Sequence, residues 1–134
     1  MTSVPDSIRH AYLATVITVA GQRVVQAVMD LGPFWVLTAN NPGSEPLDNA
    51  ENAKRHQMLS NQLRLDGHRS YPAVGTSPDG SWSEESVAVP GLDQAAALAY
   101  GRRFGQDAVF EVTADELWVH GCAEDWQVSR ALDA

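Results

Sequence analysis

The chain has 134 residues, which suits one domain with its own hydrophobic core, and a composition of 44% hydrophobic and 19% charged residues excludes wholesale disorder. It carries 9 Lys and Arg against 17 Asp and Glu, so the formal net charge of −8 disfavours binding along the phosphates of a nucleic acid. The one cysteine, Cys122, excludes an intramolecular disulfide and a zinc site built on several thiolates.

The start of the chain carries no recognisable export signal. Residues 1–9 lack a basic segment followed by an apolar stretch, and threonines interrupt the longest apolar stretch, residues 11–20. Together with the single cysteine, this predicts a cytoplasmic protein that has no membrane span.

Three segments in the first third of the chain indicate regular structure. Residues 7–12 predict a short helix, and the β-branched residues of 13–19 predict a first strand. Residues 23–29 fit a strand because of their valines, or two helical turns because of their Ala and Gln, and we slightly favour a strand paired with the first. Residues 34–39 are a continuous apolar run, which is typical of a buried central strand.

The middle of the chain carries helix and hairpin signals. Asp48 stands three residues before Glu51, as in an acidic capping box, and predicts a helix that ends at about Leu65. Two strands are expected over residues 69–74 and 82–89, because a Ser-Pro-Asp-Gly turn lies between them.

The last third of the chain predicts one more helix and one more hairpin. The helix begins after Asp93 as its N-cap and ends where Gly105 can take the left-handed conformation. Residues 108–112 and 117–121 flank a short polar turn and predict a final hairpin. The tail, residues 122–134, is expected to be loose or helical.

These elements together predict the fold class. We expect an α+β fold in which a mostly antiparallel sheet of about five to seven strands carries two main helices packed on it. No linker or internal repeat divides the chain, so residues 1–134 are expected to form a single domain.

Four short motifs occur in a fixed order along the chain. They are Thr-Ala-Asn-Asn-Pro-Gly-Ser at residues 38–44, Asn52 with Arg55, Gly75 through Gly-Ser-Trp-Ser-Glu-Glu-Ser at residues 80–86, and Arg-Phe-Gly-Gln-Asp-Ala at residues 103–108. Through these motifs the chain from residue 12 to about residue 119 resembles a bacterial family known as domain of unknown function number three-two-nine-three. The resemblance implies that the four motifs belong together, and it implies no activity.

The first two motifs hold candidate binding residues. Asn41 and Ser44 follow a predicted strand and precede a predicted helix, where backbone N–H groups can hold an anion, although their side chains can equally set the turn. Asn52 and His56 lie at the polar end of an otherwise apolar helical stripe. They either satisfy buried backbone groups or open on a cavity, and the charge of Arg55 at the edge slightly favours the cavity.

The last two motifs add a carboxylate and further polar groups. Glu84 and Ser86 share one face of a predicted strand; a half-buried Glu84 beside an arginine could act as a general base, although structural ion pairs give this pattern more often. Trp82 is either a stacking platform or part of the core, and we favour the core. Arg103 suits the negative end of the helix dipole, whereas Gln106 indicates a specific hydrogen bond.

No cofactor or metal site is expected from the sequence. The four histidines are scattered singly, without a helical His pair or a His-x-Glu spacing, and there is no glycine-rich phosphate loop.

Two hypotheses follow for function. In the first, the candidate residues converge on a pocket for a small polar or anionic ligand, with or without catalysis. In the second, the protein is a non-enzymatic interaction module that uses its acidic surface with Trp118 and Trp126 to bind a protein partner or a second copy of the chain. The candidate ligand-binding residues are Asn41, Ser44, Asn52, Arg55, Trp82, Glu84, Ser86, Arg103 and Gln106.

Overall fold

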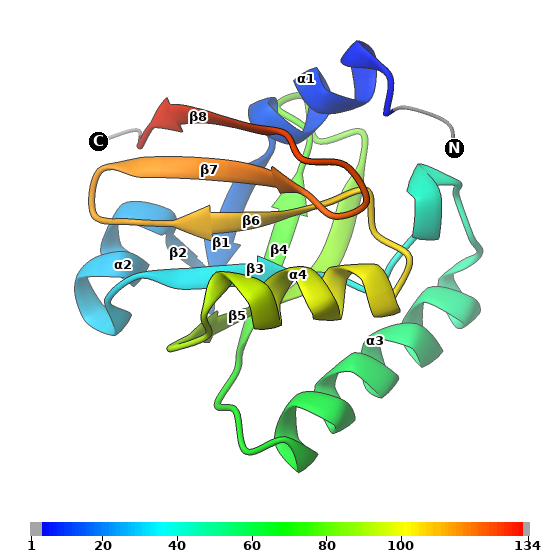
Figure 1. Cartoon of the computed structure of the whole chain (residues 1–134), viewed down its shortest axis with the longest axis horizontal. Coiled ribbons are helices and arrows are strands. Elements are labelled where there is room, and N and C mark those ends of the chain that lie inside the picture. Colours follow the sequence, from blue (N-terminus) through cyan, green and yellow to red (C-terminus); the bar gives the residue numbers. More distant parts are fainter. Residues whose placement is uncertain (1–3, 133–134) are drawn as a thin grey trace.

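The structure is a computed structural model that describes residues 4–132, and these residues form one curled antiparallel sheet with helices on both faces (Figure 1). The helices are α1 (Asp6–Ala14), α2 (Val24–Leu31), α3 (Asn49–Leu65) and α4 (Gln94–Arg103), with a single 3-10 turn η1 (Pro42–Ser44). The strands are β1 (Val16–Val19), β2 (Gln22–Arg23), β3 (Phe34–Leu37), β4 (Tyr71–Thr76), β5 (Ser83–Pro90), β6 (Ala108–Val112), β7 (Glu116–Gly121) and β8 (Gln127–Ala131).

The eight strands of the described residues follow the order β2-β1-β4-β5-β3-β6-β7-β8, and every neighbouring pair is antiparallel. The α+β class and the mostly antiparallel sheet are therefore confirmed. The strand number exceeds the predicted five to seven, and residues 4–132 form four α-helices where two main ones were expected. The two predicted main helices correspond to α3 and α4.

The sheet separates two hydrophobic cores. Phe34 and Val36 of β3 face the core that is covered by α1 and α2, whereas Trp35 and Leu37 face the core that is covered by α3 and α4. This alternation follows from the period of two in a strand. Because both faces are covered, all four residues are buried, as the continuous apolar run predicted.

For the segment 23–29 the sequence left a strand and a helix open; the strand that we slightly favoured is wrong, and the helical alternative is confirmed. The segment forms helix α2, in which Ala27 and Val28 are buried, and the chain contributes only the two-residue strand β2 ahead of it. Val24 and Leu31 pack on the same core, so the apolar residues recur at the spacing of one helical face. Helical periodicity here outweighs the strand preference of β-branched side chains.

The tail was predicted to be loose or helical, and this is also corrected. Within the described part of the tail, β8 pairs with β7 over its whole length, and Val128 packs on the core beneath α1. Arg130 donates from Nε to the carbonyl of Leu13 and from Nη2 to that of Thr15, at 2.8 and 2.9 Å. The strand lies at the edge of the sheet and carries few apolar residues. Its composition therefore did not predict a strand.

The helix starts agree with the predicted capping. The Asp48 carboxylate accepts a hydrogen bond from the Glu51 amide at 2.8 Å, and Asp93 accepts one from the Ala96 amide at 2.7 Å. Within residues 4–132, no helix has the length and apolar character needed to cross a bilayer.

Candidate functional site

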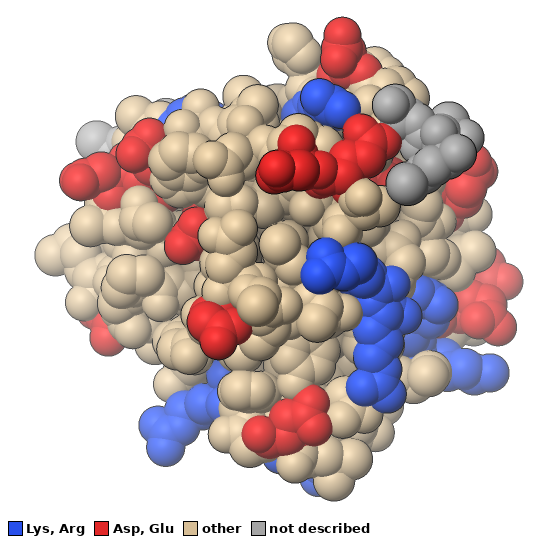
Figure 2. All heavy atoms as spheres, in the orientation of Figure 1, with Lys and Arg blue, Asp and Glu red and all other residues tan. Residues whose placement is uncertain are grey.

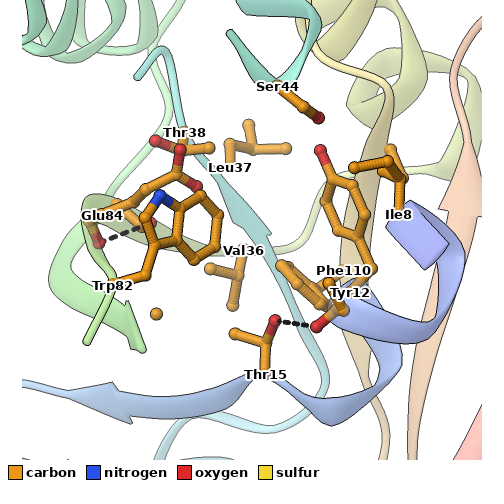
Figure 3. A pocket seen from close by; sticks show the side chains of 14 residues that line it. Ile8, Tyr12, Thr15, Val36, Leu37, Thr38, Ser44, Trp82, Glu84 and Phe110 are labelled. Atoms are coloured by element: carbon orange, nitrogen blue, oxygen red, sulfur yellow. Dashed lines mark hydrogen bonds between the residues drawn. The ribbon is translucent and has the colours of Figure 1, made fainter. Parts of the chain in front are cut away.

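A cavity of about 200 Å³ lies between α1 and the sheet (Figure 3). One side of the cavity is lined by α1 and by Thr15, the residue that follows it. The lining residues of the helix are Ile8, Ala11 and Tyr12, whose spacing places them on one face. The sheet and the η1 turn supply the other lining residues, which include Val36, Thr38, Ser44, Gly75, Trp82, Glu84, Ser86, Ala108 and Phe110.

Aromatic rings form much of the cavity wall. The rings of Tyr12 and Phe110 lie with their centroids 5.6 Å apart, tilted by 46°. Figure 3 shows Trp82 and Glu84 on one side of the cavity and Tyr12 on the other. Trp82 is 41% exposed and therefore lies at the mouth, not in the core as we had favoured.

Strand alternation brings one carboxylate into the cavity. Glu84 and Ser86 point inward from β5, whereas Glu85 points to the opposite face, where its Oε2 lies 3.0 Å from Nε2 of His56. The Glu84 Oε2 accepts a hydrogen bond from the Asn41 side-chain amide at 2.8 Å. No Lys, Arg or His among residues 4–132 forms an ion pair with Glu84.

The surroundings of Glu84 change its acidity. Burial raises the pKa of this carboxyl to about 7, and the hydrogen bond from Asn41 opposes the shift only in part. A carboxyl group that titrates near neutral pH can accept or donate a proton under physiological conditions. The cavity therefore contains a polar group that can serve as a hydrogen-bond acceptor or, when ionised, as a negative charge.

A second polar group lies across the cavity from Glu84. Ser44 Oγ donates a hydrogen bond to Asp107 Oδ2 at 2.6 Å, and the Tyr12 hydroxyl interacts with Ser44. Burial together with the negative charges of Glu84 and Asp107 raises the pKa of Tyr12, so its phenol stays protonated. Ser44 has a φ of 62°, a left-handed conformation that costs free energy outside glycine and that often occurs at binding sites.

Asn41 and Asn52 bond to each other and fix the loop that leads to Ser44. The Asn41 side-chain oxygen accepts from the Asn52 amide and from the backbone of Leu47, both at 2.9 Å, and the Asn52 oxygen accepts from the backbone N–H of Asn41 at 2.9 Å. Asn52 therefore does not line the cavity. It holds Asn41 in the orientation that contacts Glu84.

Arg55 is also engaged with backbone. Its Nε donates to the Ala39 carbonyl at 2.6 Å, and its Nη2 donates to the Phe104 carbonyl. The guanidinium thus links the end of β3 to the end of α4, and its charge does not face the cavity.

Gln106 and Gly105 also connect the loop after β3 to the end of α4. Gln106 Nε2 donates to the carbonyl of Asn40 at 3.0 Å and to that of Phe104 at 3.2 Å, which is the specific hydrogen bonding that the sequence indicated. Gly105 has a φ of 72°, and a Cβ there would lie 2.9 Å from Cβ of Pro42. The close approach of the loop to α4 accounts for the glycine.

Arg103 lies outside this region. Its Nη2 donates to Gln62 Oε1 at 3.1 Å, and its guanidinium carbon lies 5.9 Å from the centre of the Phe104 ring. Lys and Arg side chains gather in Figure 2 over α3 and α4, the two helices on the face of the sheet opposite α1.

The structure thus divides the nine candidate residues into groups. Four of them line the cavity, namely Ser44, Trp82, Glu84 and Ser86, and Asn41 contacts it through its hydrogen bond to Glu84. Three others, Asn52, Arg55 and Gln106, hold the loop after β3 in place. Arg103 lies apart from the cavity.

The sequence did not identify several residues that line the cavity or lie beside it. Tyr12, with Ile8 four residues before it, belonged to an amphipathic stripe that could have been read as the inner face of a helix. Phe110 was placed in the core, and its ring lies there and also lines the cavity. Asp107 stood inside the last motif, but no pattern linked it to Ser44, 63 residues away. No group of three or more His, Cys, Asp or Glu side chains in the described part of the chain could hold a metal ion.

The fold and the site define a small α+β protein with a curled antiparallel sheet and a half-buried carboxylate in a cavity beneath its first helix. A sequence profile with the description "Protein of unknown function (DUF3293)" matches residues 37–109, more than half of the chain. The chain belongs to this family. The matched region contains Glu84 and all four motifs up to Ala108, and α1 precedes it. No curated protein and no solved structure gave a match.

Proposed function

We propose that the protein binds a small polar molecule in the cavity between α1 and the sheet, with Glu84 as a direct contact. One observation carries the proposal: a half-buried carboxylate faces open space and has no cationic partner in residues 4–132. Partial burial of an ionised carboxylate lowers the stability of a fold, since desolvation disfavours its charge. A ligand that contacts Glu84 offsets this cost and accounts for its presence.

The size and lining of the cavity restrict the ligand. Pockets for drug-sized molecules measure about 300–1,000 Å³, so a cavity of about 200 Å³ suits a smaller metabolite. An anion is disfavoured, because Arg55 and Arg103 do not line the cavity and Glu84 does. The proposal therefore retains the small polar ligand and omits the anionic one.

The test is a thermal-shift screen of small amines, alcohols, amides and carboxylates against wild type and two matched variants. Ala11→Leu places a larger side chain at an exposed position that lines the cavity, and Ala14→Leu places the same side chain on α1 outside the lining. A compound at a hundredfold excess over its Kd stabilises the folded state by about 2.7 kcal/mol.

We expect at least one compound to raise the Tm of wild type and of Ala14→Leu while having little effect on Ala11→Leu. Equal shifts in all three proteins would place binding elsewhere and remove the proposal. A screen in which no compound stabilises wild type would also count against it.

A second proposal, self-association, is favoured by one observation. Val16 of β1 and Val74 of β4 are 46% and 38% exposed and lie on the same face of adjacent strands. Trp118 and Trp126 are each half-buried in their own chain. Trp118 lies beside His120, and Trp126 lies beneath Arg9. Light scattering after size exclusion separates the cases, since a monomer at all concentrations rejects self-association.

A further inference from the structure

The charges around the cavity are of one sign. Glu84 lines it, and Asp107 accepts the Ser44 hydrogen bond at its edge, whereas the lining contains no Lys, Arg or His from the described residues. The hydrogen bond from Asn41 is made to Glu84 Oε2, and Glu84 Oε1 accepts none from residues 4–132. An occupant that carries positive charge would supply the missing partner.

The hydroxyl groups of the wall also favour a donor or a cation. Thr38 Oγ1 donates to the carbonyl of Glu85 at 2.8 Å, Ser86 Oγ donates to that of Glu84 at 3.3 Å, and Ser44 Oγ donates to Asp107. A hydroxyl has one hydrogen and two lone pairs, so these three oxygens have used their hydrogens and retain acceptor capacity. The wall is therefore poor in hydroxyl donors for an anion.

The aromatic rings fit a particular kind of cation. Trp82, Tyr12 and Phe110 line the cavity together with Glu84, and the faces of such rings attract a cation within about 6 Å of the ring centre. A hydrated metal ion needs several oxygen ligands, and residues 4–132 contain no cluster that could provide them. An alkylated ammonium group is weakly hydrated and can contact apolar and aromatic walls without losing strong bonds to water.

We infer that the cavity takes a small organic cation, whose alkylated ammonium group lies among the rings of Trp82, Tyr12 and Phe110 and faces the Glu84 carboxylate. This inference rests on the proposed function and specifies the ligand class of that same site. The hydrophobic side chains Val36 and Ile8 complete the contact with the alkyl groups.

Titration calorimetry of the full chain tests the ligand class. The cationic probes are ammonium, tetramethylammonium and choline, and the neutral probe is 3,3-dimethylbutan-1-ol, which has the shape of choline without its charge. Measurement at about pH 8 keeps Glu84 largely ionised, since this pH lies above its pKa of about 7. We expect affinity to rise from ammonium to tetramethylammonium and choline, and choline to bind about tenfold more tightly than the neutral alcohol.

Three variants test the residues. Glu84→Gln removes the charge and keeps the shape, and Trp82→Leu removes the ring at an exposed position; each should weaken choline binding by about tenfold. The matched control is Glu85→Gln, which makes the same charge change on the opposite face of β5 and should leave choline binding unchanged. Unfolding curves confirm that each variant is folded.

The outcomes separate this inference from the proposed function. If the neutral alcohol binds as tightly as choline, or if Glu84→Gln binds choline normally, the cation inference is overturned. In either case, loss of that binding in Ala11→Leu would leave binding in the cavity standing, and normal choline binding by Glu84→Gln would remove the direct contact to Glu84 from the proposed function. If neither choline, tetramethylammonium nor the alcohol binds at millimolar concentration, the inference is rejected, and the broader screen decides the proposed function independently.

Discussion

Glu84 is held in an environment that favours its neutral form when the cavity has no cationic occupant. The neighbouring amide of Asn41 gives one hydrogen bond to its carboxylate, and the titratable groups facing this side of the cavity are Tyr12 on α1 and, across Tyr12, Asp107 before β6. Neither supplies a positive charge. The free energy of ionising Glu84 therefore depends mainly on burial.

This environment predicts a pH-dependent stability. The pKa of Glu84 is raised from its ordinary 4.5 to about 7, so the folded protein binds this proton more tightly than the unfolded chain does. The resulting stabilisation is fully present below pH 4.5 and is lost as the pH rises through about 7. Glu84→Gln, which does not titrate, should become more stable than wild type across this interval, by a difference on the order of 3 kcal/mol at its upper end.

Urea unfolding at intervals from mildly acidic to mildly alkaline pH measures this difference. Glu85→Gln is the control for a change of one charge on the same strand, because Glu85 faces away from the cavity towards His56. A stability difference between wild type and Glu84→Gln that does not vary with pH would contradict the assignment of a raised pKa to Glu84.

For single residues, the sequence predicted which face of a strand a side chain occupies more easily than which groups it contacts in the fold. The period of two correctly separated Glu84 and Ser86 from Glu85, because strand geometry is local. The partners of Asn52 and Arg55 could not be derived, since they are backbone groups brought near by the tertiary fold. A polar motif that binds a ligand and one that fixes a loop have the same composition.

The loop between β3 and α3 is fixed by hydrogen bonds from α3 and from the segment after α4. Asn41, Asn52 and Arg55 fix the segment between β3 and α3, and Gln106 fixes it against the end of α4. These hydrogen bonds connect residues of the first, second and last motifs, and they set the position of the turn that carries Ser44 to the cavity.

Helix α4 packs closely on the sheet at one glycine, and this contact predicts the effect of a substitution. A Cβ on Gly101 would lie 2.5 Å from Cys122 Sγ and 2.8 Å from Val109 Cγ1. Alanine gains about 1 kcal/mol of helix propensity, whereas overpacking costs about 1–3 kcal/mol. Because both contacted side chains are buried, we expect Gly101→Ala to lower the free energy of unfolding by about 1 kcal/mol in a urea titration.

The same contact provides an internal control. In a Cys122→Ala background the nearer clash is absent, so the cost of Gly101→Ala should fall or change sign, giving a coupling energy of at least about 0.5 kcal/mol. Additive effects of the two substitutions would show that α4 does not press on Cys122.

Local signals explain which elements could be predicted. The capping aspartates Asp48 and Asp93 and the turn between β4 and β5 act over a few residues, and the corresponding elements were predicted correctly. Helix α2 was left as the less favoured alternative because its valines carry both helical spacing and strand propensity. Strand β8 is stabilised by pairing with β7 and by contacts to α1, which no local pattern encodes.

Over the whole molecule, the beginning and the end of the described chain are tied together. Arg130 of β8 donates to the carbonyls of Leu13 and Thr15 at the end of α1, and Glu124 accepts a hydrogen bond from Arg9 at 3.3 Å. Helix α1 makes one wall of the cavity, so β8 supports the site although it contributes no lining residue.

We therefore predict that Arg130→Ala destabilises the protein and loosens α1. Loss of charge-assisted hydrogen bonds to two backbone carbonyls should cost about 2–3 kcal/mol, and amide exchange in α1 should accelerate more than in α4. Arg130→Lys should recover part of the stability, because one ammonium cannot reproduce both bonds in the same geometry. Uniform acceleration across the sheet and all helices would indicate a global effect and no special tie to α1.

The most direct measurement is an NMR titration of the Glu84 side-chain carboxyl carbon, assigned by its absence in Glu84→Gln. We expect a pKa of about 7 in the free protein, and a lower pKa when choline saturates the cavity, because a cation stabilises the ionised form. A pKa close to the ordinary 4.5 that does not move with choline would contradict the claim that Glu84 is a desolvated carboxylate that binds a cationic ligand.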